Sequence, residues 1–127
     1  MTAPLTQSSI ALAGFLKTVP GFDKLSDLKL KQLAQEFQPL RYPMGRAIFT
    51  NKVLPTQFSI VYQGQVRLLG YDPRTEAPLT LQLLEAGETL GWLGLLCDRP
   101  IETAIASTET ICLTLPALTF LKLIAQE

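Results

Sequence analysis

The chain has 127 residues, no histidine and a formal net charge of zero, with 47% hydrophobic and 17% charged residues. This length and composition suit one folded domain with a single core rather than a disordered segment. Zero net charge without a long basic run argues against nucleic acid as a partner, and no apolar run approaches the roughly 18 residues of a membrane span, so we expect no direct membrane contact.

Two short helices are expected at the N-terminal end, within residues 8–37. Ser8 or Ser9 can cap a first helix that runs to about Thr18, and Ser26 can cap a second one. Apolar residues recur at i, i+3, i+4 and i+7 in both helices: Leu12, Phe15, Leu16 and Val19, then Leu30, Leu33, Ala34 and Phe37. This spacing predicts that each helix buries one face.

Between residues 38 and 115 the hydrophobic period changes from 3.6 to 2, which indicates β-strands. The expected strands are residues 38–42, 46–50, 57–62, 65–71, 78–84, 102–107 and 109–115. The turn at Gln63-Gly64 predicts that the third and fourth strands pair as a hairpin. Short strands at even spacing, with helices at both ends, predict a mainly β fold: a jelly-roll barrel with flanking helices.

A C-terminal helix is expected over residues 116–127, opened by Pro116. Its apolar stripe consists of Ala117, Phe120, Leu121 and Ile124. The sequence stops inside this helix, so we expect a single domain, residues 1–127, that is excised from a longer chain. An exposed apolar stripe favours association, and we therefore expect a weak homodimer through this helix.

The absence of histidine disfavours an enzyme. Metal-dependent barrel oxygenases need imidazole ligands, and Ser-His-Asp and Cys-His nucleophiles need an imidazole base. Glu85 and Glu88 are a carboxylate pair, but their place in a Glu-Ala-Gly-Glu turn favours solvated loop carboxylates. We therefore expect no catalytic residue, no metal and no resident cofactor. Cys97 and Cys112 are expected to be reduced thiols of a cytoplasmic protein.

Residues 87–104 form an unusual stretch, with three glycines among bulky apolar residues. On a short helical turn Gly91 and Gly94 would leave one face bare, so that backbone N–H groups could approach an anion. Alternatively, Gly87, Gly91 and Gly94 only allow a tight corner of a small barrel to pack. Spacing alone favours this second interpretation.

Three segments share their order and motifs with a known family: Phe37 to Gly45 with Ile48-Phe49, Ile60 to Leu68, and Gly87 to Leu96. They resemble the opening strands, the central hairpin and the phosphate-binding cassette of the cyclic nucleotide-binding domain family. The resemblance covers about residues 10–127. It implies a non-catalytic jelly-roll domain with a cassette at residues 87–104. The ligand-binding residues that it implies are Gly87, Glu88, Leu90, Gly91, Trp92, Leu93, Gly94, Leu95, Arg99, Ile101, Glu102 and Thr103.

The cassette departs from the family pattern where the ligand would be held. The resemblance implies a ribose-binding glutamate after the second glycine and a phosphate-binding arginine after the proline, but this chain has Trp92 and Ile101 there, with Glu102 next. A carboxylate repels a phosphodiester, so we expect ordinary cAMP and cGMP binding to be lost or altered. Thr103 can supply the hydroxyl that follows the arginine, and Arg99 can offer a substitute cation.

Trp92 allows two interpretations. A large amphipathic ring could adapt the pocket to an apolar or aromatic ligand, or could contact another domain. Alternatively, the ring plugs the vacated pocket and fills the core, which is the interpretation that the sequence favours.

The residues from Gly91 to Leu96 and from Pro100 to Ser107 also resemble the N-terminal domain of cyanobacterial ABC exporters that carry a double-glycine-leader cysteine peptidase. This resemblance implies a regulatory or docking module on the cytoplasmic face of the membrane, in an ATP-driven exporter of peptides or bacteriocins. Its partners would be other domains of the same chain. The alternative is the ligand-sensing domain of a catabolite-activator-type transcription regulator, which needs a helix-turn-helix after residue 127.

Overall fold

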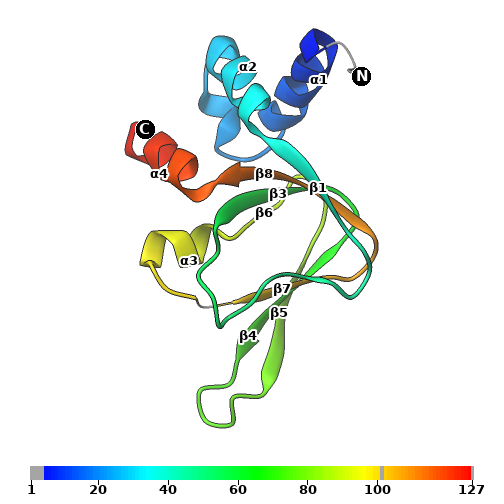
Figure 1. Ribbon diagram of the computed structural model, residues 1–127, viewed down its shortest axis with the longest axis vertical. Coiled ribbons are helices and arrows are strands. Elements are labelled where there is room, and N and C mark those ends of the chain that lie inside the picture. The colour runs from blue at the N-terminus through cyan, green and yellow to red at the C-terminus, as the bar shows by residue number, and fades with distance from the viewer. Residues whose placement is uncertain (1–4, 101, 127) are drawn as a thin grey trace. The chain divides into compact units, whose positions relative to one another are not determined.

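The computed structural model describes residues 5–100 and 102–126, and the chain divides into two compact units, Met1–Gln38 and Pro39–Glu127. Figure 1 shows helices in the first unit and mainly strands in the second. No helix among the described residues is long and apolar enough to cross a membrane.

The helical unit holds three elements: α1 (Leu5–Lys17), the 3₁₀ helix η1 (Phe22–Lys24) and α2 (Asp27–Glu36). The predicted cap of α2 is confirmed, because Ser26 Oγ accepts a hydrogen bond from Lys29 N at 3.1 Å. The predicted start of α1 at Ser8 or Ser9 is wrong. No glycine or proline interrupts residues 5–13, so the helix begins before the two serines.

The apolar stripes predicted for the two helices are confirmed. Leu16 and Val19 are fully buried, and Leu12 and Phe15 are half-buried. All four stripe residues of the second helix are buried: Leu30, Leu33, Ala34 and Phe37. The rings of Phe22 and Phe37 lie 6.3 Å apart at 57°. The apolar period of the sequence therefore identified the inward faces correctly.

The second unit has eight described strands and two helices: β1 (Gln38–Tyr42), β2 (Ala47–Phe49), β3 (Gln57–Gln63), β4 (Val66–Tyr71), β5 (Pro78–Leu84), β6 (Thr89–Leu90), α3 (Trp92–Cys97), β7 (Thr103–Ala106), β8 (Thr110–Pro116) and α4 (Ala117–Gln126). They form two four-stranded sheets, in the orders β1-β8-β3-β6 and β2-β7-β4-β5. This is the mainly β jelly-roll fold that the sequence predicts, with β6 and η1 as additional short elements.

The predicted hairpin between the third and fourth strands is wrong. β3 pairs antiparallel with β8 and β6, whereas β4 pairs with β5 and β7 in the other sheet. Gly64 has φ of 101°, and a Cβ there would lie 2.5 Å from the backbone oxygen of Glu109. A tight turn signal specifies a change of direction but not a strand partner, and this turn carries the chain from one sheet to the other.

The core of the second unit fills the space between its sheets. Its central cluster is Val61, Val66, Leu84, Leu90 and Ala104, against which Ile48, Phe49 and Leu68 pack. α4 adds the ring of Phe120, which stacks on Phe58 with the ring centres 4.3 Å apart.

The predicted surface stripe of the C-terminal helix needs a correction. Phe120 is buried and so is Leu123, while Leu118 and Ile124 are exposed. The helix turns its aromatic residue inward because Phe58 lies opposite it. Only Ile124 of the predicted stripe is therefore exposed, and the exposed Leu118 was not part of that stripe.

Candidate functional site

The cassette begins with a turn between β5 and β6. Glu85 N donates a hydrogen bond to Glu88 Oε2 at 2.7 Å, and Gly87 N donates to Val61 O at 2.9 Å. Gly87 has φ of 92°, which favours glycine. Glu88 therefore closes its own turn, as a loop carboxylate does, and the turn is fixed to β3 by Gly87.

The glycines of α3 face the protein's own chain. Gly91 precedes α3 with φ of 91°, and a Cβ there would lie 2.9 Å from Gln57 O. A Cβ at Gly94 would lie 3.1 Å from both Arg99 O and Pro55 Cδ. The bare face therefore allows close packing against β3 and Pro55, which supports the packing interpretation of the glycine spacing.

Apolar residues of the cassette divide into an inward and an outward group. Leu90 and Leu95 are buried and Leu93 is half-buried. Trp92 and Leu96, four residues apart on α3, are 43% and 50% exposed. The expectation that Trp92 fills the core is therefore wrong: positions i and i+4 of a helix lie on one face, and this face of α3 points to solvent.

Thr103 lies at the centre of a polar network that the sequence did not reveal. Thr103, on β7, is 6% exposed. Its Oγ1 accepts a hydrogen bond from Asn51 N at 3.0 Å and donates one to Asn51 Oδ1 at 3.5 Å. A further hydrogen bond joins Thr103 Oγ1 to the hydroxyl of Tyr71 at 2.7 Å. The hydroxyl assigned to ligand binding is thus already engaged within the protein.

Asn51 and Tyr71 were missed because they are far from the cassette in sequence. β7 lies between β2 and β4, so that Ala104 pairs with Phe49 and Thr103 with Leu69. This order brings the end of β4 and the loop after β2 beside Thr103. Only the strand order, which the sequence does not give, could have indicated these two residues.

The remaining predicted residues follow α3. Arg99 is exposed, its backbone N–H bonds Gly94 O at 3.1 Å, and it takes part in neither ion pair found among the described residues. Glu102 is half-buried, and this burial raises the pKa of its carboxyl group. Ile101 lies outside the described residues. The cassette therefore places a partly desolvated carboxylate beside Thr103.

The described residues contain no group of three or more His, Cys, Asp or Glu side chains that could hold a metal ion. Cys97 is an exposed free thiol, while burial raises the pKa of the Cys112 thiol to about 12.

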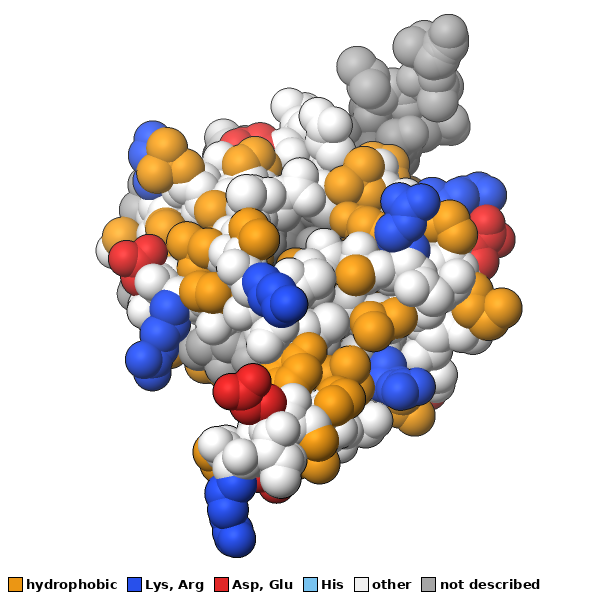
Figure 2. Space-filling model, turned by 60° about the horizontal axis from the view of Figure 1, so that its bottom comes forward, with side chains coloured by type: hydrophobic (Ala, Val, Ile, Leu, Met, Phe, Trp, Pro, Cys, Tyr) orange, Lys and Arg blue, Asp and Glu red, His pale blue; other side chains and the backbone are white. Residues whose placement is uncertain are grey.

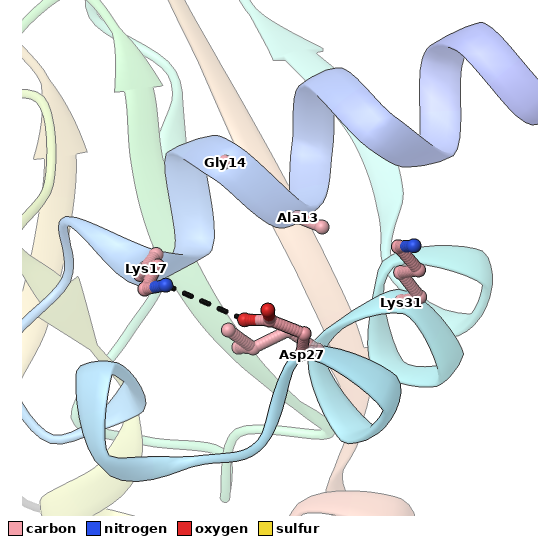
Figure 3. Close-up of a pocket in the computed structure, with 6 residues that line it drawn as sticks. Ala13, Gly14, Lys17, Asp27 and Lys31 are labelled. Atoms are coloured by element: carbon pink, nitrogen blue, oxygen red, sulfur yellow. Dashed lines mark hydrogen bonds and ion pairs between the residues drawn. The ribbon is translucent and has the colours of Figure 1, made fainter.

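A shallow hollow lies between α1 and α2 of the helical unit (Figure 3). Lys17 Nζ and Asp27 Oδ1 form an ion pair there at 3.3 Å, and Lys31 lies beside them. Both side chains of the pair are more than half exposed, and exposed pairs contribute only about 0–1 kcal/mol to stability. This hollow is lined by residues of the helical unit alone and contains no cassette residue.

A model of the cyclic nucleotide-binding domain matches residues 39–127, well over half of the chain. The chain belongs to this domain family. Its matched part coincides with the strand unit, from β1 to α4. The matched range includes α3 and the two glycines before it, Gly87 and Gly91.

Proteins of different kinds are similar to this chain in sequence or in fold. The potassium channel AKT1 of Oryza sativa subsp. indica is 28% identical over 91 residues, 72% of this chain and 9% of the channel. The regulatory domain of Toxoplasma gondii protein kinase A, solved with cAMP, has a TM-score of 0.87 at 22% identity, over 94% of this chain and 46% of that one. For the Thermus thermophilus catabolite activator protein, the TM-score is 0.71 at 31% identity, over 83% and 49%.

The matched part of this chain thus spans less than half the length of each of these three proteins, and under a tenth of the channel. The family and the jelly-roll fold predicted from the sequence are confirmed by these matches.

Proposed function

We propose that this cyclic nucleotide-binding domain is a non-catalytic regulatory domain that does not bind cAMP or cGMP with ordinary affinity. One observation supports this most directly: the hydroxyl of Thr103 is bonded to Asn51 and Tyr71. A cyclic phosphate that needs this hydroxyl has to displace an internal hydrogen bond.

Electrostatics acts in the same direction. No arginine follows the cassette proline, Pro100. Ile101 occupies that position, and an acidic residue, Glu102, comes next. Burial already raises the pKa of Glu102, so its ionised form is poorly solvated. A phosphodiester brought near this carboxylate adds a like charge without a compensating cation, which opposes binding.

The exposed face of α3 suits a docking role. Trp92 and Leu96 present a ring and an aliphatic side chain to solvent one helical turn apart. Tryptophan is enriched at the energetic centres of protein interfaces. In the proposed function, this face contacts another domain of the same chain and transmits the state of the regulatory domain.

Two kinds of parent protein fit this role. The resemblance of the cassette and of β7 favours a cytoplasmic module of a peptide or bacteriocin exporter with a cysteine peptidase domain. The alternative is the ligand-sensing domain of a catabolite-activator-type transcription regulator, which is favoured by the 31% identity to the Thermus thermophilus protein.

Calorimetric titration with cAMP, cGMP and a cyclic dinucleotide, with Trp92 fluorescence recorded in parallel, tests the ligand proposal. We expect neither heat nor a fluorescence change at ligand concentrations up to about 100 μM. Binding tighter than about 10 μM would contradict the proposal. If the Arg99→Ala variant then lost that binding, Arg99 would be identified as the substitute cation.

A gain-of-function pair sharpens the experiment. Ile101→Arg combined with Glu102→Ala introduces the missing cation and removes the opposing charge. The control is the double variant Ile101→Gln with Glu102→Ala, which lacks the cation. We expect the arginine variant to bind cAMP at least about tenfold more tightly than this control, since charge-assisted hydrogen bonds are about twice as strong as neutral ones. Equal affinities of the two double variants would show that charge does not limit binding.

A further inference from the structure

The second unit exposes some hydrophobic side chains and buries some hydroxyl groups. On the face of the molecule shown in Figure 2, hydrophobic side chains gather beside the β4–β5 hairpin. Conversely, four residues with a hydroxyl group are buried: Ser59, Thr103, Thr110 and Thr114. Thr103 and Thr110 form hydrogen bonds within the protein through their side chains. Ser59 is 3% exposed, and its side chain forms no hydrogen bond with any other residue that the structure describes.

Ser59, on β3, lines a small hollow with a volume of about 30 Å³. Residues two apart on a strand share a face, and Val61 belongs to the core cluster, so the side chain of Ser59 also points between the two sheets. Among the described residues, no fully enclosed side-chain oxygen or nitrogen lacks a hydrogen-bond partner. Since Ser59 Oγ has no such partner, protein atoms do not enclose it, and it opens into the hollow.

Tyr42, on β1, brings a second hydroxyl to the same hollow. Within the described ranges, residues 5–100 and 102–126, its side chain also forms no hydrogen bond. Burial and, to a smaller extent, the neighbouring Cys112 thiol raise the pKa of Tyr42. Its hydroxyl therefore stays neutral at physiological pH and can both donate and accept a hydrogen bond. The hollow thus receives two neutral hydroxyls from two strands, β1 and β3, that β8 separates.

The lining of the hollow limits what can bind there. Besides the two residues with hydroxyls, the lining consists of Ile48, Phe49, Pro55, Thr56 and Gln57, none of which is charged. An ion would lose its hydration without a compensating charge, and an apolar molecule would leave both hydroxyls without a partner. A buried water needs roughly 10–15 Å³ and two to four polar partners. The volume and the two hydroxyls therefore suit roughly one or two water molecules.

We propose that this hollow is a binding site for ordered water, which bridges the hydroxyls of Ser59 and Tyr42. The site borders residues against which the cassette packs. Phe49 and Gln57 line the hollow, and a Cβ at Gly91 would lie 3.7 Å from Phe49 Cε2 and 2.9 Å from Gln57 O. The bound water therefore links β1 to β3 beside the start of α3, and it belongs to the support of the cassette helix.

Removing the hydroxyl of Ser59 tests the proposal through the sign of its effect on stability. If water satisfies this hydroxyl, Ser59→Ala removes a hydrogen bond, and we expect the unfolding equilibrium constant, measured in urea, to rise about fivefold. If the hydroxyl has no partner at all, alanine removes an unsatisfied buried group, and the constant stays the same or falls. This second result would overturn the proposal.

A double-mutant cycle tests whether the water bridges both hydroxyls. Tyr42→Phe alone should raise the unfolding constant about twofold, because Tyr42 is half-buried and bulk water replaces part of the lost bond. In the Ser59→Ala background the same change should have less effect, because the bridge is already broken. The control is Tyr71→Phe in that background: Tyr71 bonds Thr103 and does not line the hollow, so its effect should be unchanged. An unchanged effect of Tyr42→Phe as well would refute the bridge.

Oxygen-17 magnetic relaxation dispersion detects the water itself, because it counts water molecules that a protein holds for longer than bulk water. We expect the count for the wild type to fall by at least about one in the double variant Ser59→Ala with Tyr42→Phe. The count should not fall in Tyr71→Phe, whose hydroxyl lies outside the hollow. An equal count in the wild type and the double variant would show that no long-held water occupies the site.

Discussion

Replacing Thr103 by valine removes the hydroxyl at the centre of the cassette network while keeping the shape of the side chain. Asn51 N loses its acceptor in a partly buried place, and such a loss destabilises a protein by about 1–3 kcal/mol. The hydroxyl of Tyr71 also loses its partner, but Tyr71 is half-buried and water can replace that bond in part. We therefore expect Thr103→Val to lower the free energy of unfolding by about 2 kcal/mol.

Urea unfolding followed by far-ultraviolet circular dichroism measures this change. Thr103→Ser keeps the hydroxyl and is the matched control. Tyr71→Phe alone should cost about 1 kcal/mol, but the double variant should cost less than the sum, because the two changes remove the same bond. Equal stability of Thr103→Val and the wild type, or strict additivity with Tyr71→Phe, would refute the proposed network.

Three further predictions concern the glycines, the thiols and the half-buried carboxyl of Glu102. Gly64→Ala should lower the free energy of unfolding, measured in urea, by about 3 kcal/mol or more, since backbone strain adds to overpacking. Gly87→Ala is the matched control: Gly87 has a similar φ but nothing within 4 Å of its Cβ, so this change should cost only about 1–2 kcal/mol. Equal losses in the two variants would contradict the contact at Gly64. In the native protein at about pH 8, an alkylating reagent should modify Cys97 alone, because Cys112 keeps its proton up to a pKa of about 12, and mass spectrometry should count both thiols after unfolding. The raised pKa of Glu102 favours the protonated form in the folded state, so its contribution to stability is present below the unfolded pKa of about 4.3 and is lost as pH rises through the folded pKa. Glu102→Gln should therefore gain stability over the wild type at neutral pH and not in acid, and an equal difference at both would exclude this linkage.

Period and composition predicted most of the secondary structure because each element follows a local rule. Ser26 caps α2 through its own side chain, and the alternation of Leu79, Leu81 and Leu83 indicates β5 without reference to any other strand. The error at Gln63-Gly64 has a different origin. Which strand pairs with β3 depends on residues 111–116, about fifty positions later, and no local pattern contains that information.

The candidate site shows the same division. The cassette itself was recognisable because its glycines, Trp92 and the residues around Arg99 are contiguous in the chain. Asn51 and Tyr71 belong to the site only because β7 lies between β2 and β4. The exposure of Trp92 could not be predicted from its residue type and its position in the chain. Whether a tryptophan on a six-residue helix points inward or outward depends on which face of the helix packs against the protein, and here Gly91 and Gly94 form that face.

The central position of β8 has a consequence for how the protein forms. β8 lies between β1 and β3, so two strands made early in synthesis both pair with the last of the strands that the structure describes. Pairings between distant segments slow folding, because the loop between them must close before any contact forms. On the ribosome, the pairing of Ile60 with Leu113 and of Val61 with Cys112 cannot form until β8 has emerged. The jelly roll is therefore completed only after translation has passed β8, and until then one edge of β3 lacks its neighbouring strand.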